Sequence, residues 1–194
     1  AGYEWTDIDY DKEDQSTSPI SDSEEQRYYV GLDWEITAKS RGRVKLGRNT
    51  KEFDDSVLGK DREYLVELQL SHQLTPKTTV DVNGFRRPVE TSISETAYSL
   101  IYQLKAVLTH QFTHKISGGL DCGYKYEKFK GDLTYGGETK ERRDDLFSVT
   151  PSLSYQIKRW LSTRLDYIYE KRDSNFSDFS YSTHTVSVML KAAF

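Results

Sequence analysis

A strict alternation of apolar and polar residues over residues 147–157 constrains the fold most strongly. In FSVTPSLSYQI, every odd position is Phe, Val, Pro, Leu, Tyr or Ile, and every even position is Ser, Thr or Gln. A second alternating run, LSTRLDYIYE, follows at residues 161–170 after only three residues. A two-residue period is typical of a β-strand whose two faces meet different surroundings. The two runs therefore predict adjacent strands joined by a tight turn.

The same period recurs along the chain and predicts an all-β protein of about ten antiparallel strands. No segment shows the period of a helix. With the two runs above, the predicted strands cover residues 1–10, 27–37, 41–53, 62–74, 78–88, 98–112, 116–127 and 181–194.

The connections between these strands alternate in length. Four tight turns are predicted at residues 38–40, 75–77, 113–115 and 158–160. Five long polar loops are predicted at residues 11–26, 54–61, 89–97, 128–144 and 174–180. Short turns on one side and long loops on the other, around strands of about 10 residues, are typical of transmembrane β-barrels.

Composition agrees with a membrane barrel rather than a membrane helix. Only 36% of the residues are hydrophobic, 30% are charged, and the mean hydropathy is -0.74. No stretch reaches the roughly 18 to 20 apolar residues of a spanning helix. A barrel needs only an outer apolar band of about 25 Å, so its lumen face and loops can be polar. The net charge of -4 offers no basic surface for nucleic acid.

Aromatic residues gather at both ends of the predicted apolar stripes. Such girdles mark the two membrane interfaces. A soluble antiparallel barrel or sandwich would show the same alternation, but the girdles and the turn pattern favour the membrane. The predicted girdle residues are Tyr28, Trp34, Tyr64, Tyr98, Phe112, Tyr126, Trp160, Tyr169 and Phe194.

The opposite parity carries charges of both signs and is predicted to line a lumen. Side chains fill a barrel of eight strands, whereas 16 to 18 strands leave a water channel, so a ten-stranded lumen should be narrow. The predicted lumen-lining residues are Arg43, Lys45, Glu63, Glu67, Asp81, Arg87, Lys105, Asp121, Lys125, Glu127, Arg164, Asp166, Glu170 and Arg172.

The C-terminal run from residue 155 to 194 resembles the closing hairpin of a family of β-barrel porins often encoded with exopolysaccharide-export genes. The resemblance lies in Arg172, Asp173, Ser174 and Asn175, followed by Tyr181 and a terminal Phe. It implies a bacterial, Gram-negative outer-membrane location and a role in passage or assembly rather than chemistry. It also implies that the C-terminal strand is recognised by the outer-membrane assembly machinery.

An enzymatic alternative comes from the ten-stranded omptin proteases, which place an Asp pair and an Asp-His pair at the rim. Here Asp54 and Asp55, Asp144 and Asp145, and His184 are the candidates. The Asp two residues before the His is missing because position 182 is Ser. Acid-base catalysis needs groups within reach of each other, so solvated acids explain these residues better.

The sequence thus predicts one outer-membrane β-barrel domain over residues 1–194, or the C-terminal ten strands of a larger barrel. The expected function is a non-catalytic, porin-like or export-associated component for transport. The alternatives are a structural barrel that docks or sheathes a periplasmic or surface partner and, third, an omptin-like protease. Membrane lipid and either a protein or a polysaccharide are the expected partners, without nucleic acid, metal or cofactor.

Overall fold

The computed structural model describes residues 1–8, 23–53, 60–89, 91, 96 and 98–193. Ten strands account for most of them, and among the described residues no helix is long and apolar enough to span a bilayer. The elements are β1 Gly2–Ile8, β2 Ser23–Thr37, β3 Ser40–Phe53, β4 Lys60–Thr75, β5 Thr78–Val89, β6 Tyr98–Gln111, β7 Ile116–Tyr135, β8 Glu138–Lys158, β9 Leu161–Ser174, the short 3-10 helix η2 Ser177–Phe179, and β10 Tyr181–Ala192.

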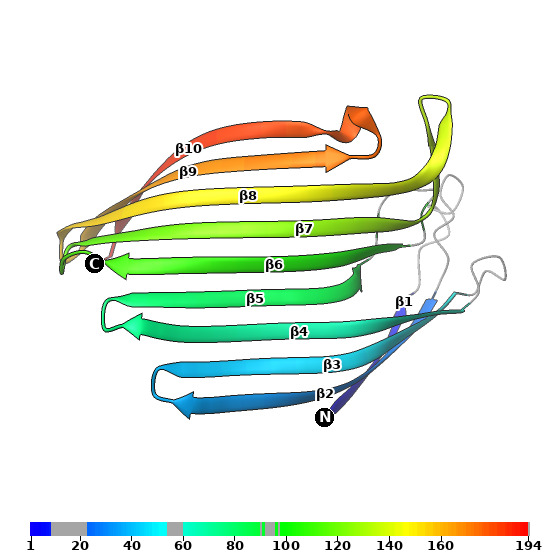
Figure 1. The fold of residues 1–194 in the computed structure, drawn as a ribbon, viewed down its shortest axis with the longest axis horizontal. Coiled ribbons are helices and arrows are strands. Elements are labelled where there is room, and N and C mark those ends of the chain that lie inside the picture. The colour runs from blue at the N-terminus through cyan, green and yellow to red at the C-terminus, as the bar shows by residue number, and fades with distance from the viewer. Residues whose placement is uncertain (9–22, 54–59, 90, 92–95, 97, 194) are drawn as a thin grey trace.

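The strands form one antiparallel sheet in which each strand pairs with its neighbours in the sequence (Figure 1). The predicted all-β, up-and-down fold is therefore confirmed, and so are the four tight turns. The sheet is open, because β1 and β10 form its two edges and are not hydrogen-bonded to each other. β1 pairs only with Ser23–Tyr29 of β2. The closed ring of a barrel is thus not seen in the described residues.

Register separates the sheet into two chemically different faces. Val30 pairs with Leu46, which pairs with Val66, so apolar residues lie side by side across β2, β3 and β4. We call this side the apolar face; Val30 and Leu46 are 62% and 51% exposed on it. The opposite side carries Lys45 opposite Glu67, and we call it the charged face.

The predicted loop at residues 128–144 is wrong, because β7 and β8 continue through it as a long hairpin. They meet at Gly136 and Gly137, whose φ angles of 62° and 84° are those of a tight hairpin turn. A register shift between Lys128 and Asp132, at Gly131 with φ 123°, lets the extension bend. The extension projects beyond the neighbouring strands in Figure 1.

Strands β2, β4 and β5 extend into three of the other loops that were predicted to be long. Residues 23–26 and 60–61 belong to β2 and β4, and Val89 ends β5. Most of the other residues predicted as loops, 11–22, 54–59 and much of 90–97, lie outside the described residues. Between β9 and β10 the predicted loop is confirmed and contains η2.

Pro151 leaves a gap in the strand ladder instead of the bulge that its missing N–H predicts. It pairs with Leu120 on β7. On the β9 side the ladder stops at Val149 and resumes at Ser152, and the register is unchanged across the gap. A proline has no amide hydrogen to donate, so the strand accommodates it by losing pairing on one side only.

Candidate functional site: the charged face of the sheet

All fourteen predicted lumen residues lie on the charged face. The cross-strand register connects Arg43 and Lys45 on β3 to Glu67 on β4 and from there to β5. The same face continues through Lys105 and Asp121 to Arg164 on β9. Their role as the lining of a lumen stays a prediction, since the sheet is open.

Ion pairs connect many of these charges. Between strands, Lys105 lies 2.6 Å from Asp121, and Lys45 lies 3.5 Å from Glu67. Within β9, Arg164 lies 2.8 Å from Asp166. Exposed pairs of this kind contribute about 0–1 kcal/mol each, so their main effect is to fill and order the face rather than to hold the fold.

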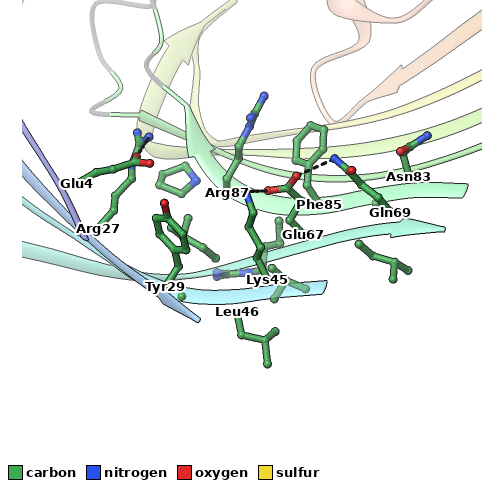
Figure 2. A pocket seen from close by; sticks show the side chains of 17 residues that line it. Glu4, Arg27, Tyr29, Lys45, Leu46, Glu67, Gln69, Asn83, Phe85 and Arg87 are labelled. Carbon is green, nitrogen blue, oxygen red and sulfur yellow. Dashed lines mark hydrogen bonds and ion pairs between the residues drawn. The ribbon is translucent and has the colours of Figure 1, made fainter. Parts of the chain in front are cut away.

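A hollow of about 250 Å³ lies on the charged face toward the long-loop ends of β2 to β5. Figure 2 shows Tyr29, Lys45, Glu67 and Arg87 rising from one side of the sheet, while Leu46 points to the other. The hollow is lined by Glu4, Arg27, Tyr29, Lys45, Leu46, Gly47, Leu65, Val66, Glu67, Leu68, Gln69, Asn83, Gly84, Phe85, Arg86, Arg87 and Pro88.

A second hollow, of about 650 Å³, lies toward the tight-turn ends of the same strands. Its lining includes Asp33, Glu35 and Asp81, with Arg41 and Arg43. Acids therefore outnumber cations at this end, whereas cations outnumber acids in the first hollow. The charged face is thus electrostatically uneven along its length.

Most predicted girdle residues lie on the apolar face or at the turns. Tyr28, Tyr64, Phe112 and Trp160 are 51%, 67%, 55% and 43% exposed. Trp34, Tyr126 and Tyr169 are half-buried, and Phe194 lies outside the described residues. The indole of Trp34 covers Gly42 on the neighbouring strand, where any Cβ would collide with it.

Tyr98 departs from the girdle, although its register places it on the apolar side of β6. It is only 3% exposed, and its hydroxyl donates to Glu63 at 3.2 Å. β4 and β5 pair only as far as Val66 and Arg86. Arg86 fills the end of this ladder by donating to the Tyr64 carbonyl and to Glu63. Because β4 and β5 are not paired at the rim, Arg86 and Tyr98 from the apolar side reach the carboxylate of Glu63 on the charged side.

Among the described residues, the groups of the omptin alternative are not brought together. Asp144 is 1% exposed and forms an ion pair with Arg142. Asp145 lies on the apolar face, where it accepts a hydrogen bond from the Tyr124 hydroxyl. His184 lies on the apolar face, 2.7 Å from the Tyr167 hydroxyl. Asp54 and Asp55 lie outside the described residues.

The predicted loop residues form a packed cluster at the rim that sequence reasoning missed. Arg142 Nε and Nη2 donate to both oxygens of Asp144, at 2.6–3.1 Å. The Arg142 guanidinium carbon lies 3.9 Å from the ring centre of Phe179 and 4.8 Å from that of Phe129. We call these four residues the rim cluster.

Asn175 attaches the η2 segment to the edge of this hairpin. Its side-chain oxygen accepts from the Arg143 amide at 2.8 Å, and its side-chain nitrogen donates to the Glu141 carbonyl at 2.8 Å. The alternation of Phe129, Leu133 and Tyr135, followed by two glycines, was the signal for this hairpin. The many charges between these residues obscured it.

Glu141 lies in the same extension, past the last residue of β8 that pairs with β9. Partial burial opposes its ionisation, but hydrogen bonds from Arg143 and Lys128 outweigh that effect, so the pKa of Glu141 is below its usual value. The Lys128 and Arg143 nitrogens lie 3.2 and 3.0 Å from its carboxylate.

A single up-and-down antiparallel sheet, with one apolar and one charged face, is the strand arrangement found in transmembrane β-barrels. The family described as "Putative beta-barrel porin 2" matches residues 3–194, and the chain belongs to this family. A search of the curated proteins found no match to the chain.

Proposed function

We propose that the protein is a non-catalytic, porin-like component of the bacterial outer membrane that passes a polar solute through a narrow, charged lumen. The observation that carries this proposal is the placement of fourteen predicted charged residues on one face of the sheet. In a bilayer, charges of both signs on one face are tolerated where that face is turned from lipid toward water.

Closure of the sheet is part of the proposal. Unpaired backbone groups at a strand edge are too costly in hydrocarbon for an open sheet to remain in a membrane. We therefore propose that the edges at β1 and β10 are paired in the membrane, so that the charged face encloses the lumen. We also propose a role in polysaccharide export, because the C-terminal hairpin resembles that of export-associated porins.

Conductance of the purified protein in a planar bilayer tests this function. Paired charges that project into a narrow lumen leave no wide path for water, so we expect small conductance steps. The double variant Lys105→Ala/Asp121→Ala removes a 2.6 Å ion pair and its bulk, and it should enlarge the steps. Large, steady steps from the unmodified protein would contradict a narrow lumen.

A matched variant separates the lumen from general disturbance of the sheet. Leu104→Ala also removes bulk from β6, but at a position that is 53% exposed on the apolar face. It should leave the conductance unchanged. An equal effect of both changes would refute the assignment of the charged face to the lumen.

The projecting hairpin favours docking of a partner at the rim as a second function. Tyr135 is 43% exposed at the hairpin tip, and its ring lies 4.9 Å from that of Phe179. An ordered projection with an exposed aromatic residue is suited to protein contacts. Tyr135→Ser should abolish co-purification of a cross-linked partner without altering conductance; retained co-purification would refute docking at this tip.

A further inference from the structure

The hollow at the long-loop end of the charged face carries an excess of positive charge. Its lining contains four cations, Arg27, Lys45, Arg86 and Arg87, but only two carboxylates, Glu4 and Glu67. The whole chain has a net charge of -4. Because Glu25 and Glu63 pair with Arg27 and Arg86 from outside the lining, the positive charge that an anionic ligand would meet is centred on Arg87.

Arg87 differs from the other three cations. Arg27 pairs with Glu25 at 2.8 Å, Lys45 with Glu67 at 3.5 Å and Arg86 with Glu63 at 2.5 Å. Within the described part of the chain, no carboxylate forms an ion pair with Arg87. Among the described residues, the exposed guanidinium of Arg87 on the charged face thus has its hydrogen-bonding edge available.

Phe85 orients this guanidinium. The Arg87 guanidinium carbon lies 4.3 Å from the centre of the Phe85 ring. Stacking on an aromatic face holds the planar group in place while leaving its N–H donors free for two parallel hydrogen bonds. A carboxylate can accept two parallel hydrogen bonds from this planar group.

Two amides and a phenol lie on the same face as Arg87. Gln69 and Asn83 pair directly across β4 and β5, and Asn83 is exposed. Gln69 donates to Glu67 at 2.9 Å through its nitrogen, which leaves its oxygen available. The Tyr29 hydroxyl points into the hollow in Figure 2. Groups that both donate and accept are suited to the hydroxyls of a sugar.

We propose that this hollow binds a carboxylated saccharide, with its carboxylate on Arg87 and its hydroxyls on Asn83, Gln69 and Tyr29. The inference rests on the proposed function and specifies the class of solute that the lumen selects. Chloride and other small anions would meet the same charge but not the paired amides. Recognition therefore requires the acid and the sugar together.

Calorimetric titration of the full protein in a zwitterionic detergent at low salt tests the proposal. The probes are trigalacturonate and its uncharged methyl ester, which differ only at the carboxylates. We expect trigalacturonate to bind and the ester to bind at least ~10-fold more weakly, because a charged bidentate pair contributes more than a neutral hydrogen bond. Equal binding of acid and ester, or no binding of the acid, would overturn the inference.

Arg87→Gln should weaken trigalacturonate binding about tenfold or more, and Arg87→Lys should have an intermediate effect because it keeps the charge without the fork. Arg41→Gln is the matched control. It removes the same charge from the same face, in the acidic hollow at the tight-turn end. Equal losses from Arg87→Gln and Arg41→Gln would show that only general electrostatics is at work and would refute the site.

The folded state of each variant is checked by the heat-dependent shift of the barrel on a gel, and Arg87→Lys is used for the test if Arg87→Gln does not fold.

Failure of the inference is distinguishable from failure of the proposed function. Small conductance steps without trigalacturonate binding would refute the ligand class and leave the function standing. Binding without any conductance would refute passage and leave the site standing.

Discussion

Removal of the Asp144 carboxylate should destabilise the rim hairpin strongly. The side chain is 1% exposed and accepts three hydrogen bonds from Arg142, which is itself 6% exposed. Asp144→Ala leaves that guanidinium buried without its partner, a change that typically costs about 3–5 kcal/mol. The cation–π contacts of Arg142 with Phe129 and Phe179 are present with and without Asp144, so they do not reduce this loss.

Hydrogen–deuterium exchange over residues 129–142 measures this loss where it occurs. A loss of about 3–5 kcal/mol should speed exchange by roughly 160- to 5,000-fold, since 1.36 kcal/mol is a factor of ten. Exchange in the middle of β6, residues 101–108, should not change.

Asp173→Ala is the matched control on the neighbouring strand. Asp173 pairs with Lys171 at 2.7 Å, but the two side chains are 62% and 48% exposed. Such a pair contributes about 0–1 kcal/mol, so exchange should barely change. If Asp144→Ala had no more effect than Asp173→Ala, the rim cluster would not stabilise the hairpin.

Two further predictions concern lipid and pH. Leu104→Arg and Leu153→Arg, at positions 53% and 49% exposed on the apolar face, should each cost about 2–4 kcal/mol of folding free energy in lipid vesicles. Gln103→Arg and Ser154→Arg, on the charged face, should cost far less, and equal losses would contradict the two-face assignment. The lowered pKa of Glu141 means that its contacts stabilise the hairpin fully above the ordinary carboxylate pKa of about 4 and are lost as pH falls through the lower folded value. After correction for the intrinsic pH dependence of amide exchange, protection of the hairpin should therefore fall at acid pH in the unmodified protein and fall less in Glu141→Gln.

The strands and their faces were predictable because a two-residue period directly encodes a sheet with unlike sides. Residues 147–157 lie within strand β8, as the alternation predicts. Leu104 lies on the apolar face and Gln103 on the charged face, as their positions in the alternating pattern predict. The extension through residues 128–144 was not predictable from hydropathy, because a hairpin outside the lipid needs no apolar band. The local signals for it were the Gly136–Gly137 turn and the alternation of Phe129, Leu133 and Tyr135 before that turn.

The pairing of charges depends on register, which the sequence alone does not fix. Lys105 meets Asp121 because β6 and β7 align Val107 with Asp121 and Lys105 with Gly123, which places the two charges diagonally. The burial of Tyr98 similarly follows from the ending of the β4–β5 ladder at the rim, which parity does not reveal. The hollow around Arg87 likewise combines residues from several strands.

Single-cysteine labelling along β6 in native membranes tests the central claim most directly. In a Cys122→Ser background, cysteines placed one at a time at positions 101–108 are exposed to a water-soluble, membrane-impermeant maleimide. We expect labelling to follow a period of two, with labelling at Gln103, Lys105 and Val107 on the charged face and protection at Leu104, Ala106 and Leu108 on the apolar face. Labelling without that period, or labelling of the even positions instead, would contradict a sheet with one face toward water and the other toward lipid.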